Sequence, residues 1–207
     1  MNEKQVDKGH YDFERYCYPE RWDSYYHQIQ EILAVRPESV LEVGAGDETT
    51  KRYVTRALGC SYKTLDLAED LSPDIVGSIL DIPLADRSVD VSCVFEVLEH
   101  IPFEKVPEAL SELKRVSRRF IFISVPHFGP MVDLSIKIPF LPRIGFFFKI
   151  PFPKKHVWNG QHYWELGKKG FSPRAFKKLL ESYGEVVKEY VPREAPYHHF
   201  FVIRLHP

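Results

Sequence analysis

The chain has few cysteines and almost no excess charge of either sign. Cys17, Cys60 and Cys93 are the only cysteines in 207 residues, and no two have the close spacing of a metal-binding or redox pair. We therefore expect reduced thiols in a cytoplasmic protein. Lysine and arginine (28) nearly balance aspartate and glutamate (29), which leaves a formal net charge of -1. This balance argues against nucleic acid as a partner.

The sequence also lacks a long uninterrupted apolar run. Residues 134–152 are the most apolar segment and are about long enough to cross a bilayer. Prolines and basic residues interrupt this segment: Lys137, Pro139, Pro142, Arg143, Lys149 and Pro151. Because prolines break the helix that a lipid-exposed span needs, we reject a transmembrane helix. Residues 1–18 are polar and charged, unlike a signal peptide.

Apolar strand-like runs alternate with helix-like segments through most of the chain. We expect strands at 39–43, 61–65, 74–79, 89–95, 119–125, 185–191 and 198–205, and helices at 21–35, 48–58, 103–116 and 172–183. This alternation indicates a mostly parallel sheet covered by helices on both faces, with ligands bound outside the carboxyl ends of the strands. We expect one domain over residues 1–207, with an N-terminal helical arm (1–37) and an insert or lid (128–170) without a clear period.

A glycine turn follows the first expected strand. Gly44 and Gly46 let the backbone turn sharply and let a ligand approach main-chain atoms, and Glu42 lies two residues before the first glycine. Such a turn between a strand and a helix forms a nucleotide-type cofactor site. Glycine turns are common, however, so the motif alone leaves ordinary chain reversal as an equal alternative.

Polar residues also end the later strands, and the ends of parallel strands converge on one rim of a sheet. Asp66 lies about 20 residues past the glycines, where an acid can accept hydrogen bonds from both ribose hydroxyls. Asp81, at the next strand end, can accept from an exocyclic adenine amine. Each acid alone is equally consistent with a helix cap or loop residue. Four further residues belong to this rim: Glu96, Glu99, His100 and His127.

Four segments resemble the successive motifs of class I S-adenosylmethionine-dependent methyltransferases: 40–46, 64–67, 79–84 and 89–101. The phrases Leu-Asp-Ile-Pro-Leu (80–84) and Glu-Val-Leu-Glu-His-Ile (96–101) are similar to the type 11 subset that includes ubiquinone- and menaquinone-biosynthesis enzymes. The resemblance is specific over 38–127, weaker over 161–184 and uninformative over 128–160. It implies an α/β, Rossmann-like fold with a seven-stranded, mostly parallel sheet whose last strand is reversed, and S-adenosylmethionine as cofactor.

The resemblance assigns ten residues to the cofactor. Those at the methionine end and its turn would be Glu42, Gly44, Ala45, Gly46, Phe95 and Glu96. Asp66 would hold the ribose hydroxyls while Leu67 packs on the adenine, and Asp81 would accept from the adenine amine while the Ile82 backbone meets the ring edge. The chain departs from the family at Glu48, where a third glycine is common.

Two other nucleotide sites are disfavoured. A nicotinamide dinucleotide fingerprint would need a glycine or alanine where Thr49 stands, and no Gly-Lys-Ser/Thr loop for nucleoside triphosphates occurs. We therefore predict a methyltransferase that acts on a small-molecule acceptor. The alternative is an S-adenosylmethionine-binding scaffold or regulatory protein without transferase activity, and a nicotinamide-dependent reductase is a third, weaker hypothesis.

Methyl transfer needs alignment and, for a protonated acceptor, a base. His127 and His100 are the candidate catalytic bases, because neutral histidine suits proton removal near pH 7. A structural role for either histidine is the competing interpretation. His156 and His162 flank a loop that could close over the site. The sequence shows no dedicated metal cluster, so we predict no metal.

The insert mixes apolar and basic residues. Ile-Pro-Phe-Leu-Pro (138–142), Phe-Phe-Phe (146–148) and Ile-Pro-Phe (150–152) lie among lysines and an arginine. One hypothesis is a pocket for an apolar or lipid-like acceptor, with peripheral membrane contact through 134–155 at anionic head groups. The alternatives are a plain hydrophobic lid and a dimer contact, and the sequence leaves the oligomeric state open.

Overall fold

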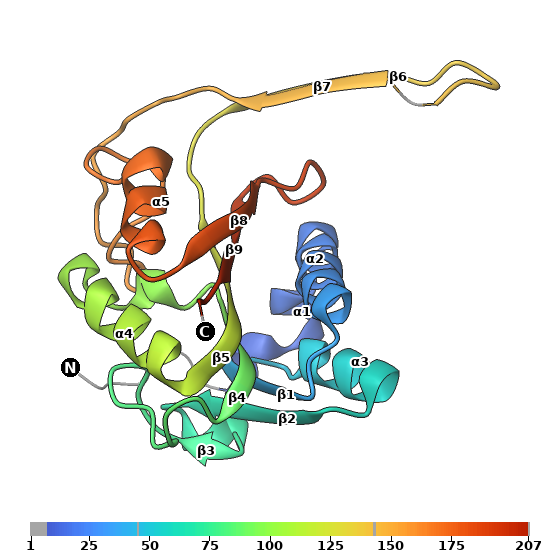
Figure 1. Cartoon of the computed structure of the whole chain (residues 1–207). Helices are drawn as coiled ribbons and strands as arrows, with labels where there is room; N and C mark the ends of the chain where they lie inside the picture. The colour runs from blue at the N-terminus through green and yellow to red at the C-terminus, as the bar shows by residue number, and fades with distance from the viewer. Residues whose placement is uncertain (1–7, 45, 143, 207) are drawn as a thin grey trace.

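In a computed structural model that describes residues 8–44, 46–142 and 144–206, seven strands form one sheet (Figure 1). Their order is β3-β2-β1-β4-β5-β9-β8. The strands are β1 (Ser39–Val43), β2 (Ser61–Asp66), β3 (Ile75–Val76), β4 (Val89–Phe95), β5 (Ser117–Pro126), β8 (Glu185–Tyr190) and β9 (His198–Arg204). β9 pairs antiparallel with both of its neighbours, and the pairs among the first five strands are parallel. The expected parallel sheet with a reversed last strand is confirmed.

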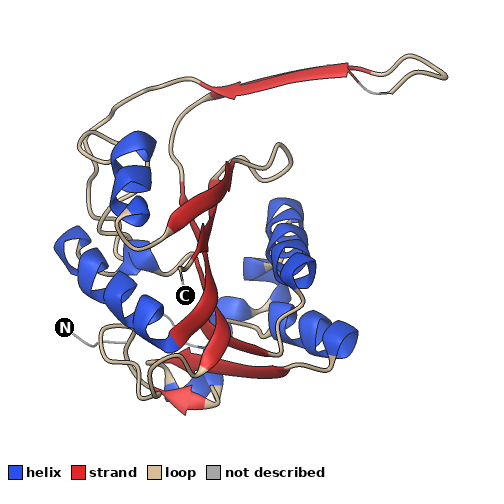
Figure 2. Ribbon diagram, in the orientation of Figure 1, coloured by secondary structure: helices blue, strands red, loops and turns tan. Residues whose placement is uncertain are grey.

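Helices cover both faces of the sheet (Figure 2). α4 (Val106–Val116) and α5 (Pro173–Glu181) lie on one face, and α2 (Pro19–Val35) and α3 (Thr49–Leu58) lie on the other (Figure 1). A short helix α1 (Phe13–Tyr16) and the 3₁₀ turns Lys8–Tyr11, Glu69–Leu71, Leu98–His100 and Phe103–Lys105 complete the helical elements. No helix within the described ranges is long and apolar enough to cross a membrane.

Two apolar clusters, one on each side of the sheet, hold these layers together. The larger cluster joins Leu110 and Leu113 of α4 and Phe176 of α5 to the inner strands. The smaller joins Ile32 of α2 and Val54 of α3 to the opposite face. Every residue of β4 is buried, as expected for a central parallel strand with a layer on each face. Burying a large apolar side chain contributes about 1.5–3 kcal/mol, so these clusters dominate the stability.

Local sequence signals account for several element boundaries. Ser172 caps α5, because its hydroxyl accepts a hydrogen bond from the Ala175 N–H at 3.2 Å, and Pro173 takes the first helical position. Gly59 ends α3 in the left-handed conformation. The helix expected over 103–116 begins as a 3₁₀ turn and becomes α-helical at Val106.

The third expected strand is much shorter than predicted. Only Ile75 and Val76 pair with β2, because the chain turns directly afterwards. The Asp81 N–H donates to the Ser78 carbonyl at 3.1 Å, and these two residues form an isolated antiparallel bridge. Residues expected to extend the strand toward Ile79 therefore lie in a turn.

The insert contains a β-hairpin that the sequence analysis missed. β6 (Met131–Ile136) pairs antiparallel with β7 (Ile144–Lys149), and the hairpin projects away from the sheet and its helices (Figure 1). In this hairpin, three cross-strand pairs share one face: Val132 with Phe148, Leu134 with Phe146, and Ile136 with Ile144. Neither strand contains a buried residue.

Candidate functional site

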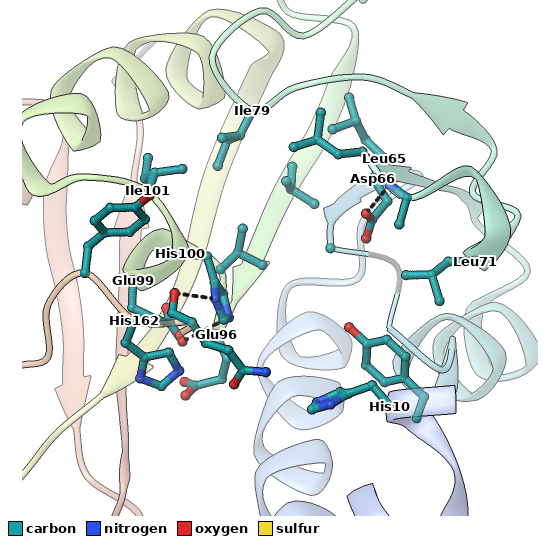
Figure 3. A pocket seen from close by; sticks show the side chains of 18 of the residues that line it. His10, Leu65, Asp66, Leu71, Ile79, Glu96, Glu99, His100, Ile101 and His162 are labelled. Atoms are coloured by element: carbon teal, nitrogen blue, oxygen red, sulfur yellow. Dashed lines mark hydrogen bonds and ion pairs between the residues drawn. The ribbon is translucent and has the colours of Figure 1, made fainter. Parts of the chain in front are cut away.

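A cavity of about 520 Å³ opens at the carboxyl ends of β1, β2 and β4. Its wall combines these strand ends with the N-terminal arm and with the loop around 158–163. In Figure 3, Asp66 and Leu71 lie across the cavity from Glu99, His100 and His162. This is the rim where the sequence predicted a ligand.

The glycine turn lies at the base of the cavity. Gly44 has φ +87°, and a Cβ added there would lie 2.5 Å from Cγ2 of Val97, so the position requires glycine. Gly46 has φ +53° and borders a smaller adjoining cavity. Glu48 stands where the family often has a third glycine, and it takes the left-handed conformation itself, with φ 59°. The turn into α3 is therefore made despite the departure, at a cost of about 1–2 kcal/mol for a residue with a Cβ. Ala45, also predicted to bind the cofactor, lies outside the described residues.

Glu42 and Phe95 border the smaller cavity beside this turn. The Tyr62 hydroxyl donates to Oε2 of Glu42 at 3.0 Å. Burial raises the pKa of the Glu42 carboxyl to about 8, although the bond from Tyr62 opposes the shift. Glu42 thus carries a proton near neutral pH until a cationic group approaches it.

Asp66 and Leu67, at the end of β2, both line the main cavity. Oδ1 of Asp66 accepts a hydrogen bond from the Ala68 N–H at 2.8 Å, which fixes the carboxylate at the strand end. Leu67 is partly exposed beside it. The position suits the predicted contacts with ribose hydroxyls and an adenine ring, which stay predictions.

Asp81 and Ile82 do not line the cavity within the described residues; Ile79 does. The Ile82 N–H donates to Oε2 of Glu112 at 2.9 Å, so it is already engaged on the α4 side. Asp81 is exposed. The predicted contacts of these two residues with adenine remain untested, and the geometry gives them less support than Asp66.

Glu96 follows β4 in an unusual backbone conformation, with φ 54°. The Ser124 hydroxyl donates to its Oε1 at 2.7 Å, and Nδ1 of His198 lies 3.1 Å from the same oxygen. Burial raises the pKa of the Glu96 carboxyl, but His198, Arg21 and Ser124 outweigh burial and hold the pKa below its ordinary value. Glu96 is therefore an anchored carboxylate at the cavity wall.

Three side chains meet at the far end of the cavity. Glu99 and His100 lie in the 3₁₀ turn after β4, and His162 comes from the loop before α5. One ligand-type atom of each lies within 4.8 Å of the others. The loop is tied to the turn by two hydrogen bonds: the Tyr163 N–H donates to the Glu99 carbonyl at 2.8 Å, and Nδ1 of His100 donates to the Gln161 carbonyl at 3.2 Å.

Burial determines the protonation of Glu99 and His100. It raises the pKa of the Glu99 carboxyl well above its ordinary value, with a further increase from the charge of Glu96. Burial, followed by the neighbouring His162, lowers the pKa of His100 to about 4. His100 is therefore a neutral imidazole near pH 7, as the predicted base requires.

His127, the other predicted base, does not line the cavity as the described residues define it. It stacks on His199 with ring centroids 5.0 Å apart, and the two Nδ1 atoms are 3.1 Å apart. Burial, then the charge of Lys149, lowers the pKa of His127 to about 3. Its predicted catalytic role remains untested, and its position directly after β5, stacked on His199 and bridged to Leu166, supports a structural role.

Comparison with known proteins gives a family match for part of the chain. Residues 41–120 match a family model described as a methyltransferase domain. The match identifies residues 41–120 as a methyltransferase domain. This agrees with the methyltransferase activity that the sequence motifs indicated, and a methyltransferase domain implies S-adenosylmethionine as the methyl donor.

Solved structures share the fold of this methyltransferase at low sequence identity. A 1,6-didemethyltoxoflavin-N1-methyltransferase from Burkholderia thailandensis is 16% identical, with 89% of this chain and 79% of that chain covered at a TM-score of 0.61. Magnesium protoporphyrin IX methyltransferase from Synechocystis PCC 6803 is 13% identical, with 99% and 90% covered at 0.62. A methyltransferase in complex with the Trm112 activator from Haloferax volcanii is 14% identical, with 94% and 96% covered at 0.59. No curated protein matches the chain.

The N-terminal arm contributes part of the methyltransferase cavity that the residue predictions omitted. His10, Tyr11, Tyr16 and Arg21 line it. The Arg21 guanidinium lies 4.4 Å from the Tyr16 ring centroid, and the Tyr11 and Tyr16 rings are 4.7 Å apart. The aromatic content of residues 1–37 is a signal for this contact, although in the sequence alone it fits an arm folded over the cofactor and ordinary packing of a helix on the sheet equally well. Three further residues line the cavity: Glu99, which the sequence placed on the rim without a role, and Tyr163 and Tyr197, which the sequence did not single out.

Proposed function

We propose that this methyltransferase moves the methyl group of S-adenosylmethionine to an apolar, lipid-like small molecule bound at the end of the cavity away from Asp66. The observation that carries the proposal is the extent of the cavity. It continues from Gly44 and Asp66 to His162 and Tyr197, beyond the strand ends that the family motifs assign to the donor.

The reaction is a direct displacement that needs little covalent chemistry from the protein. The acceptor atom forms a bond to the methyl carbon, the carbon–sulfur bond breaks, and its electron pair stays on sulfur as S-adenosylhomocysteine. The cavity would supply alignment and exclude water. Of the two predicted bases, only His100 lies at the cavity wall.

The donor assignment is testable at Asp66. We expect Asp66→Ala to weaken binding of S-adenosylhomocysteine by on the order of 1.5–3 kcal/mol, because charge-assisted hydrogen bonds are lost. Isothermal titration calorimetry measures this change. Glu104→Ala, which removes an exposed carboxylate outside the cavity, is the matched control. An unchanged affinity for Asp66→Ala would refute the ribose assignment.

The hairpin supports an apolar acceptor delivered at an anionic membrane surface. Leu134, Ile136 and Phe146 lie on its apolar face with 63%, 66% and 58% of their surface exposed. The exposed Lys137 directly follows β6 and suits anionic head groups, and its ammonium donates to the Leu141 carbonyl at 2.6 Å. Lys149, at the end of β7, does not contribute in this way, because it is half-buried, its ammonium donates to the Pro196 carbonyl at 2.8 Å, and burial lowers its pKa to about 8.

Vesicle sedimentation tests this membrane contact. We expect the wild type to pellet with vesicles of phosphatidylserine and phosphatidylcholine, and Leu134→Ser/Phe146→Ser to stay in solution. Tyr53→Ser/Val187→Ser removes two exposed apolar side chains elsewhere and serves as the control. If the wild type does not bind anionic vesicles, the membrane contact is refuted, and the hairpin is then a lid or a contact with another protein.

A turnover assay separates the enzyme from a scaffold that only binds the donor. We expect S-adenosylhomocysteine to form when the protein receives labelled S-adenosylmethionine and the lipid fraction of a cell extract, with label recovered in the organic phase. Donor binding without product from any extract fraction would favour the scaffold. Label recovered only in the aqueous phase would contradict the apolar acceptor.

A further inference from the structure

The Glu99, His100 and His162 side chains form a donor set that the displacement reaction does not require. Two imidazoles and one carboxylate converge with ligand-type atoms within 4.8 Å of one another. They come from two segments far apart in the sequence, which is why no ligand spacing was visible there. All three face the cavity (Figure 3).

The carboxylate of Glu99 is in an unusual position for a purely structural residue. Its side chain is 1% exposed, and neither carboxylate oxygen has a hydrogen-bond partner among the described residues. The nearest nitrogen that could carry a positive charge is Nε2 of His100, which lies 4.0 Å from Oε1 of Glu99. A buried carboxyl group whose oxygens have no hydrogen-bond partner is costly in either protonation state, and a bound cation would give both oxygens a partner and stabilise the ionised form.

Both histidines are oriented as metal-binding histidines are. Nδ1 of His162 donates to Oε1 of Glu165 at 3.2 Å, and Nδ1 of His100 donates to the Gln161 carbonyl at 3.2 Å. A proton held on Nδ1 leaves Nε2 as the ligand atom. Hydrogen bonds to a carboxylate or a carbonyl are the usual means by which proteins fix a metal-binding imidazole.

We propose that Glu99, His100 and His162 bind a divalent transition-metal ion of the zinc type, with an open position that faces the cavity. Ligand atoms around tetrahedral zinc lie roughly 3.3–3.5 Å apart, so small side-chain rotations would close this set on an ion. Imidazole ligands argue against Mg²⁺ and Ca²⁺, which take oxygen ligands. Glu96 stays outside the set, because Ser124 and His198 hold its carboxylate.

The open coordination position of the proposed metal ion indicates which atom of the acceptor is methylated. This step rests on the proposed function. An acceptor hydroxyl bound there would lose its proton to water, because a metal ion lowers the pKa of an oxygen bound to it. The resulting oxygen anion would attack the methyl carbon as the carbon–sulfur bond breaks. His100 cannot be a metal ligand through Nε2 and also a base through the same atom, so the metal replaces the predicted base.

Metal binding is tested directly, without donor or acceptor. Chelator-treated full-length protein is titrated with Zn²⁺ by calorimetry and with Co²⁺ by visible absorption. We expect one ion per chain for the wild type and for His206→Gln, an exposed histidine outside the cavity. Glu99→Gln and His162→Gln each remove one ligand, and we expect Kd to rise by more than the roughly 10–100-fold typical of losing an outer hydrogen-bond partner. Glu165→Gln, which loosens only the orientation of His162, should raise Kd by roughly 10-fold.

The outcomes separate this proposal from the proposed function. Equal Zn²⁺ binding by the wild type and a Glu99→Gln/His162→Gln double variant would overturn the metal site, provided that both melt at the same temperature and bind S-adenosylhomocysteine equally. If the double variant does not fold, His162→Gln alone decides in the same way. Zn²⁺ binding that needs these residues, in a protein that transfers no methyl group, would support the site and refute the proposed function instead.

Discussion

Two sets of strands in this molecule are similarly apolar and have opposite surroundings. β4 is buried along its whole length between helices on both faces of the sheet, whereas β6 and β7 contain no buried residue. Hydropathy alone does not distinguish them. The buried strand is stabilised by its own chain, and the apolar face of the hairpin has no cover among the described residues. The two regions should therefore respond differently to the same substitution.

The largest effect is expected in the buried sheet, at Phe122 of β5. Its side chain is 1% exposed and packs in the smaller apolar cluster. We expect Phe122→Ala to lower the free energy of unfolding by about 3–5 kcal/mol, because burial is lost and a cavity remains. Urea denaturation followed by circular dichroism measures the change. A loss below about 1 kcal/mol would mean that this part of the sheet is loosely packed.

The second prediction concerns the buried carboxyl of Glu42 and pH. Its pKa is about 8 when folded, so the folded chain binds more protons than the unfolded chain between about pH 4.5 and 8. Stability therefore falls as pH rises through this window, by on the order of 3 kcal/mol between pH 5 and pH 8. Glu42→Gln keeps an acceptor for Tyr62 and should flatten this slope in denaturant titrations. Glu104→Gln should keep the wild-type slope, and an unchanged slope in Glu42→Gln would contradict the assignment.

A somewhat smaller effect is expected at the glycine turn. Gly44→Ala introduces a Cβ against Val97 at a residue with φ +87°, and we expect a loss of about 2–3 kcal/mol of stability together with weaker donor binding. Gly170→Ala is the matched control, because φ is +94° there and nothing lies within 4 Å of the added Cβ. The stability of Gly170→Ala should fall only by the cost of placing a residue with a Cβ in this backbone conformation, about 1–2 kcal/mol. Equal losses in both variants would show that the contact with Val97 is unimportant.

The sheet could be predicted because its signals are local. Alternating strands and helices, Ser172 before Pro173, and Gly59 after α3 each determine the conformation of a few neighbouring residues. The expected length of the third strand was too great, because the turn at Ser78 and Asp81 is held by hydrogen bonds from the Leu80 and Asp81 N–H groups to Ser78 and has no apolar signature. The hairpin was missed although Val132, Leu134 and Ile136 alternate with period two, because flanking prolines obscured the pattern.

The residues of the candidate site also fall into two groups, those that local sequence motifs predict and those that only the fold brings together. Gly44 and Asp66 belong to motifs read along the chain, and both line the cavity. His162 joins Glu99 and His100 only through the fold, so no spacing in the sequence could reveal their convergence. The hydrogen bond from the Ile82 N–H to Glu112 is similarly non-local, and it uses the group that the family pattern assigns to adenine.

The smallest effect on stability is expected at Phe146, on the apolar face of the hairpin. Phe146→Ala removes the same atoms as Phe122→Ala, yet its side chain is 58% exposed and touches the neighbouring Phe148 rather than a core. We expect the free energy of unfolding to change by less than about 0.5 kcal/mol in urea titrations. The difference between the two phenylalanines measures how much of the apolar character of the hairpin serves folding. A loss at Phe146 comparable to that at Phe122 would show that the hairpin packs against its own chain in solution, and its apolar face would then be unavailable to a membrane.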